Sequence, residues 1–317
     1  SQVGKLVKDN WRKYPPLGVN LGFIREGTYS ANTRALSLLY LTSDMEQKAF
    51  LEYIPDQNPL IISQKQGILF LYSLIENDGE VVIPLFTQLL QSDLEVFSDR
   101  AAGNFLPEIY SGIISRYRTR ILAVDLRERL EVLEKSAQTI IEARKSDKYE
   151  GGSAREESIR PRLEPYVDIG IFTKPNPMKY EYSFSPMGRR WVCAFTGQED
   201  SAGIEEFLSR QFFQSVSTAW EIDAKPLTTP DEIVPYLKRA AKAISSSSGY
   251  APIEELALLS GIEALVDEHK IFEIGAAREA LIAFQKANPY QVRFTVDRMG
   301  LLAHARFLED NQARSSA

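Results

Sequence analysis

The chain has 317 residues, of which 44% are hydrophobic and 25% charged, the balance of an ordinary globular protein with room for two or three domains. A formal net charge of -6 and a pI near 5.3 exclude a protein coated in basic residues, so any nucleic-acid contact must come from a local basic patch. One cysteine, Cys193, excludes an internal disulfide and a cysteine-rich zinc site, and its apolar surroundings in RRWVCAF predict a buried thiol.

No stretch approaches the roughly 18 apolar residues that span a bilayer. The beginning of the chain is charged and interrupted by Pro15 and Pro16, which is not the pattern of a secretory signal. We therefore expect a cytoplasmic protein with no membrane partner.

Helical spacing of apolar residues marks 28–54 and then two helices between 63 and 91. Ser63 is the expected N-cap of the first of these two, and the turn formers at 77–79 are expected to end it. The face that this helix buries is expected to hold Ile68, Leu71, Tyr72 and Ile75. The face that the second helix buries is expected to hold Val82, Leu85, Phe86 and Leu89.

The helical pattern continues from 100 to 147, with Asp125 as the expected N-cap of its second half. The run SRYRTR places Arg116, Arg118 and Arg120 around an aromatic ring. Such a run would follow a phosphate backbone, or it would end a helix, where cations offset the negative end of the helix dipole. The sequence leaves both interpretations open.

Ser153 is the expected N-cap of the next helix, with Glu156 in capping-box position. Pro161 and Pro165 predict that this helix splits near Ile159, because proline lacks the N–H of the helical ladder. Gly170 is expected to end it. An alternating strand should follow, with Tyr180, Tyr182 and Phe184 on one face. The Ser-Pro-Met-Gly sequence at 185–188 is expected to turn into a further helix or strand.

The remaining chain predicts helices between 197 and 244, with Thr229 as a cap and Pro230 in the first turn. The Ser/Gly-rich stretch at 245–250 has the composition of a linker. Two more helices should lead into a hairpin whose strands are QVRFTV and LLAHARF, joined at 297–300.

The segment DIGIFTKPNPMKYEYSFSPMGRRW, at 168–191, combines a helix end, a glycine, a bridge, a Tyr-rich strand and then Ser-Pro-x-Gly-Arg-Arg-Trp. It resembles the second half of a winged helix-turn-helix domain, in which a β-hairpin wing follows the recognition helix and an LT-x-x-G-R turn opens the next helix. The resemblance covers about 125–195, with a weaker similarity in 250–310 and a wingless unit in 60–117. It implies a mainly α (α+β) fold of tandem winged-helix-like units with short β-hairpin wings.

We accordingly expect three domains. The first, 1–122, would be mostly helical with a helix-turn-helix-like unit. The second, 123–196, would be the winged-helix domain. The third, 197–317, would be helical and would end in the second wing-like hairpin.

The resemblance implies binding of duplex DNA, with the recognition helix in the major groove and basic side chains on phosphates. The candidate DNA-binding residues are Arg155, Arg160, Arg162, Lys174, Lys179, Arg189 and Arg190. If they bind DNA, Arg160, Arg162, Lys174 and Lys179 should point to one exposed face, unpaired by acids. The alternative is that the arginines pair with Glu156, Glu157 and Asp168 on a solvated surface.

For a DNA-binding protein, the other units would serve as dimerisation or partner-protein surfaces. The rival function is that of a scaffold subunit in a multiprotein complex, whose winged helices bind protein. Bacterial DNA processing or anti-phage defence would be one setting for such a complex. A scaffold predicts an exposed apolar patch, for which the candidates are the aromatic residues Phe207, Phe212, Phe213 and Trp220.

Enzymatic motifs are few. There is no G-x-S-x-G, Walker loop or G-x-G-x-x-G, and the two histidines are expected at a helix end (His269) and on a strand (His304). Glu221, Asp223 and Lys225 have the acid-x-Lys spacing of metal-dependent nucleases, a minor alternative. The expectation is a non-enzymatic protein with no cofactor and no metal.

Overall fold

The computed structural model of the chain describes residues 19, 21–25, 30–41, 62–92, 94–119, 124–142, 154–194 and 201–308. Within these ranges the protein is mainly helical with small sheets, which agrees with the α+β class. The chain forms two compact units that alternate along the sequence. Unit 1 comprises 1–77, 208–217 and 221–317, and unit 2 comprises 78–207 and 218–220. The division into 1–122, 123–196 and 197–317 stays a prediction.

The helix α5 (Gln64–Gln91) contributes to both units. Its N-terminus is capped as expected: the Ser63 hydroxyl accepts from the backbone N–H of Gln66 at 3.2 Å, and the Gln66 side chain accepts from the N–H of Ser63 at 3.0 Å. The turn expected at 77–79 is instead a kink at Asp78, where φ is -129° and ψ is 15°. Both predicted apolar faces of α5 are buried, which confirms the helical spacing.

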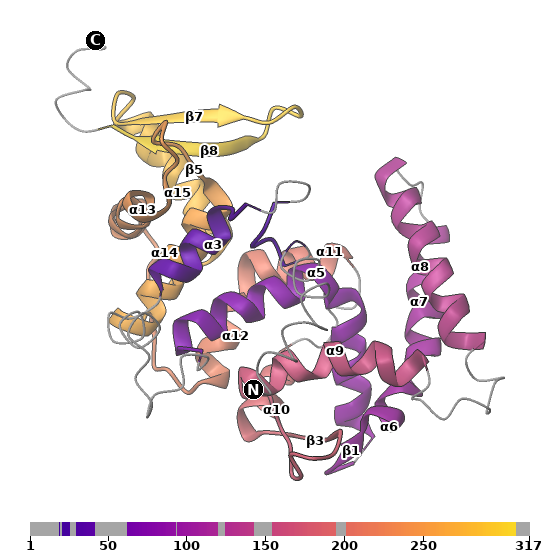
Figure 1. Cartoon of the computed structure of the whole chain (residues 1–317). Coiled ribbons are helices and arrows are strands. Elements are labelled where there is room, and N and C mark those ends of the chain that lie inside the picture. The colour runs from indigo at the N-terminus through magenta and orange to yellow at the C-terminus, as the bar shows by residue number, and fades with distance from the viewer. Residues whose placement is uncertain are drawn as a thin grey trace, which may run out of the picture. The chain divides into compact units, whose positions relative to one another are not determined.

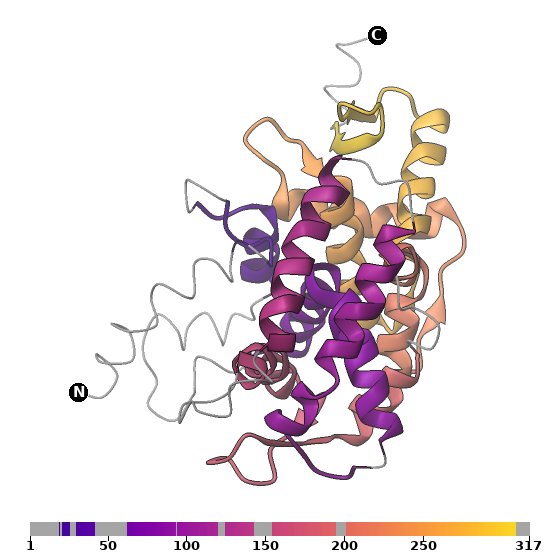
Figure 2. The ribbon, with the colours of Figure 1, turned by 90° about the vertical axis from the view of Figure 1, so that its right-hand side faces the viewer.

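Unit 2 continues after α5 with helices and three short strands. In chain order these are β1 (Phe97–Ser98), α6 (Asp99–Gly103), α7 (Leu106–Arg118), α8 (Val124–Glu142), α9 (Ala154–Asp168), β2 (Phe172–Thr173), β3 (Glu181–Phe184), α10 (Pro186–Cys193) and α11 (Ser201–Glu206). The strands form one antiparallel sheet in the order β1-β3-β2. The helices α7 and α8 lie side by side in both views, and α6 packs on α9 (Figures 1 and 2).

Aromatic rings form the core of unit 2. Phe86 of α5 meets Tyr166 of α9 and Phe172 of β2 edge to face, with ring centroids 4.8 and 4.9 Å apart. Phe172 also contacts Phe184 of β3 at 4.7 Å. Tyr182 and Phe184 are buried while their neighbours are half-buried, which confirms the predicted alternation for these two residues. Tyr180, expected on the same face, instead lies in the turn before β3 and is exposed. This core joins the sheet to α5 and α9.

The predicted split of α9 is wrong, because the helix runs through Pro161 and Pro165. A buried face holds it together despite two missing N–H groups: Ile159, Leu163 and Tyr166 are buried. Gly170 ends the helix as expected, with a φ of 81° and with the N–H of the next residue bonded to the carbonyl of Tyr166 at 2.8 Å. Ser153 lies outside the described residues.

Three local predictions need correction. Ser185, expected in a turn, is the N-cap of α10 and accepts from the N–H of Gly188 at 2.9 Å. Cys193 is exposed, not buried, because it lies at the last turn of α10 while Trp191 and Val192 face the core. Asp125 is not an N-cap, since α8 has already begun at the residue before it.

Unit 1 is built from helices and two small sheets. Its elements, besides the first half of α5, are α3 (Thr33–Tyr40), the π-helical turn Phe207–Gln211 in part, most of α12 (Phe212–Ala219), β4 (Lys225–Pro226), α13 (Pro230–Ile244), β5 (Ala251–Pro252), α14 (Ile253–Glu268), β6 (Lys270–Ile271), α15 (Ile274–Ala287), β7 (Val292–Val296) and β8 (Leu302–Phe307). Strands β4 and β6 pair in parallel. The other sheet has the antiparallel order β5-β8-β7 (Figure 1). The predicted hairpin and the Thr229 capping box are confirmed.

The stretch at 245–250 is a tight loop within unit 1, contrary to its linker-like composition. The N–H of Ser246 bonds to the carbonyl of Tyr250 at 2.8 Å, and Gly249 has a φ of 79°. The loop leads directly from α13 into β5.

Both units contain the same order of elements, helix, strand, helix, helix, strand, strand. In unit 1 this order is α13, β5, α14, α15, β7 and β8, with β6 between α14 and α15. In unit 2 it is the second half of α5, β1, α6, α9, β2 and β3, with the α7–α8 pair between α6 and α9. In each sheet the last strand lies between the other two.

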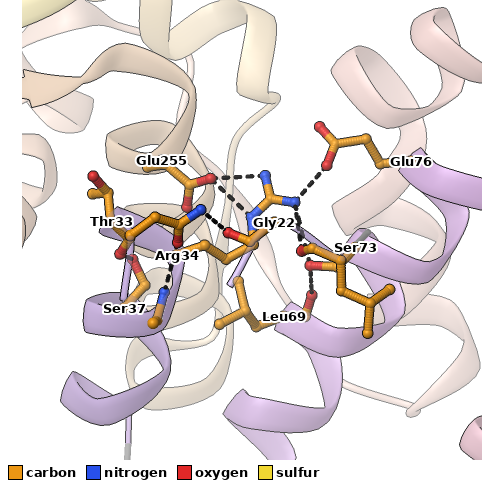
Figure 3. Close-up of polar contacts among 11 residues, drawn as sticks. Gly22, Thr33, Arg34, Ser37, Leu69, Ser73, Glu76 and Glu255 are labelled. Carbon is orange, nitrogen blue, oxygen red and sulfur yellow. Dashed lines mark hydrogen bonds and ion pairs between the residues drawn. The ribbon is translucent and has the colours of Figure 1, made fainter. Parts of the chain in front are cut away.

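A buried arginine ties three segments of unit 1 together (Figure 3). Arg34 of α3 donates to Glu255 of α14 at 2.8 Å and to Glu76 of α5 at 2.5 Å, and its Nη1 also contacts the hydroxyl of Ser73 at 3.4 Å. Burial disfavours the charge of Arg34, but the two carboxylates outweigh that effect and raise its pKa. For Glu255, burial outweighs the arginine and raises the pKa of the carboxyl. The cluster is a structural clamp.

Candidate nucleic-acid interface

The two central arginines of the predicted recognition helix are held by acids of unit 2. Arg160 donates to Asp99 at 2.6 Å, and its guanidinium lies 3.9 Å from the ring centroid of Tyr180. Arg162 donates to both carboxylate oxygens of Asp78, at 2.5 and 3.2 Å. Burial disfavours the charge of Arg162, but the interactions with Asp78 and Tyr110 together outweigh that effect and raise its pKa. Both guanidinium groups therefore already have anionic partners.

The two lysines that follow are paired as well. Lys174 bonds to Glu164 at 3.0 Å and lies over the rings of Tyr180 and Tyr182 at 5.2 and 5.6 Å. Lys179 is 3.6 Å from Glu181, and this pair is exposed. The same Glu164 accepts from the hydroxyl of Tyr182 at 2.6 Å. The expectation that these four cations form one face unpaired by acids is therefore wrong.

Three predicted contacts remain, Arg155, Arg189 and Arg190. Arg190 donates from Nε and Nη2 to the carbonyl of Ala219, at 3.2 and 2.9 Å, and so caps the C-terminus of α12. Arg189 is exposed, with no ion pair to any described residue. The side chain of Arg155 lies outside the described residues, although its backbone belongs to α9.

The run SRYRTR fits a helix end. Arg116 and Arg118 occupy the last turn of α7, where cations offset the helix dipole. Arg118 also bonds to Glu134 of α8 at 2.6 Å. Arg120 lies outside the described residues.

The aromatic patch expected of a scaffold is not exposed. Phe207, Phe212 and Phe213 are buried, and Trp220 is half-buried. Phe213 packs closely on α14, where an added Cβ at Gly261 would lie 2.1 Å from the ring. The three phenylalanines therefore belong to the buried core.

Unit 1 has a basic surface on α15 and the β7–β8 hairpin. Fewer of its cations are paired with acids than those around α9 in unit 2. Between 274 and 308 the sequence has five Lys or Arg residues against two Asp or Glu residues, an excess of three positive charges in an acidic protein. Lys286, Arg293 and Arg298 are exposed and have no ion pair with any residue that the structure describes. Arg278 is 3.7 Å from Glu254. The sequence prediction omitted these residues, although counting charges along 274–308 would have indicated them.

The turn at the hairpin tip is stabilised by the side chain of Asp297. The carboxylate of Asp297 accepts from the backbone N–H groups of Met299 and Leu301 at 2.8 and 2.9 Å, and Gly300 adopts a φ of 81°. Met299 and Leu301 are themselves exposed, as is Val296 at the end of β7. The tip thus presents Arg298 among apolar side chains.

A second polar cluster, also in unit 1, lines an open pocket of about 440 Å³. Glu268 accepts from the Tyr236 hydroxyl at 2.5 Å, from Arg239 at 2.8 Å and from Lys270 at 3.0 Å. These hydrogen bonds, of which that from Tyr236 has the largest effect, lower the pKa of Glu268 to about 2. One carboxylate at the end of α14 thus binds two cations and a hydroxyl, and through Tyr236 and Arg239 the cluster joins α13 to the end of α14.

The candidate catalytic residues lie in different structural elements. Lys225 begins β4, and Glu221 has a φ of 55° in the preceding turn. His269 is the left-handed C-cap of α14, as expected, and His304 contacts the hydroxyl of Thr295 at 3.1 Å. Within the described residues no group of three or more His, Cys, Asp or Glu side chains is placed to hold a metal ion.

No known protein-family model, curated protein or solved structure matches the chain. Among the described helices, none combines the length and the apolar character needed to cross a membrane.

Proposed function

We propose that this chain is a non-enzymatic protein that binds duplex DNA through unit 1, with α15 as the recognition helix and the β7–β8 hairpin as the wing. The order of elements supports the proposal, because helix, strand, helix, helix, strand, strand with the last strand central is the arrangement of a winged helix. The same order in unit 2 supports a tandem of two such folds. A cytoplasmic location stays our expectation.

The distribution of charge selects unit 1 for DNA. Non-specific affinity for DNA comes mainly from cations that neutralise phosphates. Lys286 at the end of α15 and Arg298 at the hairpin tip are exposed and have no acidic partner among the described residues. Arg160 and Arg162 of unit 2 would have to leave Asp99 and Asp78 first, and that exchange reduces the gain from any phosphate contact.

The second candidate function is that of a scaffold that binds protein. The ion pairs of Arg160 with Asp99 and of Arg162 with Asp78 favour this function for unit 2. A winged helix whose cations are neutralised internally has little electrostatic attraction to DNA. In this arrangement unit 1 would bind DNA and unit 2 would hold a protein partner.

Fluorescence anisotropy of a labelled duplex, titrated at low and moderate salt, tests the proposal. Replacing Lys286 and Arg298 together by Ala should weaken binding about tenfold or more, since each lost phosphate contact costs affinity. A double variant of Arg127 and Lys135 on α8 removes the same charge elsewhere and serves as the control. If neither the parent protein nor any variant binds DNA at low salt, the proposal is wrong and the scaffold function takes its place.

A further inference from the structure

The strand β7 lies at the edge of its sheet and has no β-bulge. It pairs with β8 on one side and, within the described chain, has no strand on the other. The register shifts after Thr295: residue 295 lies opposite 304, and 296 lies opposite 302. The extra residue therefore belongs to β8, and β7 itself is not bulged. Edge strands present a row of unpaired N–H and C=O groups that another strand can bind.

The hydrogen-bond pattern shows which residues of β7 face outward. The N–H of Leu308 bonds to the carbonyl of Gln291 at 2.9 Å, and the N–H of Asp297 bonds to the carbonyl of Leu301 at 2.8 Å. In an antiparallel ladder, bonded and non-bonded pairs alternate. Residues 293 and 295 therefore bond toward β8. Residues 292, 294 and 296 direct their N–H and C=O groups toward the free edge.

The sequence of the strand, Val-Arg-Phe-Thr-Val, is nearly symmetric about Phe294. The geometry points to a symmetric dimer in which β7 pairs antiparallel with β7 of a second copy, centred on Phe294. Phe294 then lies opposite Phe294 of the second copy, as a hydrogen-bonded pair that uses the outward N–H and C=O groups. Val292 lies opposite Val296 of the second copy, and Arg293 lies opposite Thr295.

This register suits the side chains as well as the backbone. Val296 is 60% exposed in the isolated chain and would gain an apolar neighbour across the interface. Arg293 would face a neutral hydroxyl rather than another arginine, so the pairing places no like charges directly opposite each other. A second copy of the chain supplies a strand of this same sequence, so no other partner needs to be assumed. The inference does not depend on DNA binding.

A five-residue strand pair is smaller than a standard interface, which buries about 1,600 Å² in total. The dimer is therefore expected to be weak and concentration-dependent. Sedimentation velocity from about 1 to about 500 μM should show the sedimentation coefficient rise from monomer to dimer, with dissociation in the micromolar range or above.

Cysteine cross-linking tests the register directly. Arg293→Cys and Thr295→Cys are made as separate variants, and both positions are exposed. Each variant also carries Cys193→Ser, because the native cysteine is exposed and could itself form a disulfide. Directly opposed residues of a non-bonded pair have Cα atoms about 4.5 Å apart, which a disulfide can bridge. Diagonal neighbours are about 7–8 Å apart, which disfavours a bridge. A mixture of the two variants should cross-link at least tenfold faster than either variant alone.

A second pair of variants tests the apolar contact. Val296→Lys should weaken dimerisation at least tenfold, whereas Val132→Lys, at an exposed valine of α8, should leave it unchanged. The inference is overturned if the parent protein remains monomeric up to the highest concentration. It is also overturned if either cysteine variant alone cross-links as fast as the mixture, or if the two lysine variants behave alike.

Discussion

Arg162 holds Asp78 by two hydrogen bonds, from Nε to Oδ2 at 2.5 Å and from Nη2 to Oδ1 at 3.2 Å. The pair connects α9 to the kink of α5, and the hydroxyl of Tyr110 accepts a further bond from Nη2 at 3.2 Å. A bidentate arginine–carboxylate pair fixes orientation as well as distance. The residue expected to bind phosphate is thus part of the framework of unit 2.

Arg162→Ala should destabilise the protein by about 3 kcal/mol, because it leaves the half-buried carboxylate of Asp78 without its partner. Urea denaturation measures this loss. Lys179→Ala, which breaks an exposed pair, should cost less than about 1 kcal/mol. If Arg162→Ala left the stability unchanged but abolished DNA binding, Arg162 would be a DNA contact and our assignment to unit 1 would be wrong.

Arg34→Ala should cost about 3–5 kcal/mol, because Glu255 and Glu76 then remain near each other with no cation between them. Adding Glu255→Gln should recover part of the loss by removing the buried charge. Arg239→Ala, at an exposed pair, is the control and should cost about 0.5 kcal/mol. Thermal or urea unfolding measures the stability of each variant. If the Arg34→Ala/Glu255→Gln variant is no more stable than Arg34→Ala, Arg34 does not stabilise the fold by neutralising Glu255.

The sequence predicted the elements whose signals are local. Ser63 and Thr229 were found as N-caps and Gly170 as a helix end, because each is determined by neighbours within a few residues. The hairpin at 292–307 followed from alternation and a turn. These features need no knowledge of tertiary contacts.

The errors concern distant partners. No local pattern indicates that Arg162 meets Asp78, 84 positions away, or that Arg34 meets Glu255, 221 positions away. Pro161 did not split α9 because burial of one face outweighed local propensity. The apolar neighbours of Cys193 in sequence predict a buried thiol, whereas its exposure depends on its position around the helix.

Two glycines should respond to alanine in opposite directions. A Cβ at Gly188 would lie 2.1 Å from the carbonyl oxygen of Ile171, so Gly188→Ala should destabilise by about 2 kcal/mol or more. At Gly112 in α7 nothing lies within 4 Å of an added Cβ, so Gly112→Ala should stabilise by roughly 0.5–1 kcal/mol. Calorimetric melting of both variants checks the contrast, and a lower melting temperature for Gly112→Ala would contradict it.

The contribution of Glu268 should depend on pH. Its pKa in the folded protein is about 2, below the ordinary value of 4.5, so the folded state favours the charged carboxylate. The stabilisation is therefore present above about pH 4.5 and is lost as the pH falls toward 2. The difference in melting temperature between the parent protein and Glu268→Gln should shrink over this interval. Glu279→Gln on the exposed surface is the control, and a difference independent of pH would contradict the assignment.

The salt dependence of DNA affinity tests the central claim most directly. The logarithm of the binding constant falls with the logarithm of salt concentration by about 0.9 per neutralised phosphate. We predict measurable binding at low salt, a slope that decreases by roughly two in the Lys286→Ala/Arg298→Ala variant, and an unchanged slope in the Arg127→Ala/Lys135→Ala control. Equal slopes in all three proteins, or no binding at low salt, would contradict the assignment of DNA binding to α15 and the β7–β8 hairpin.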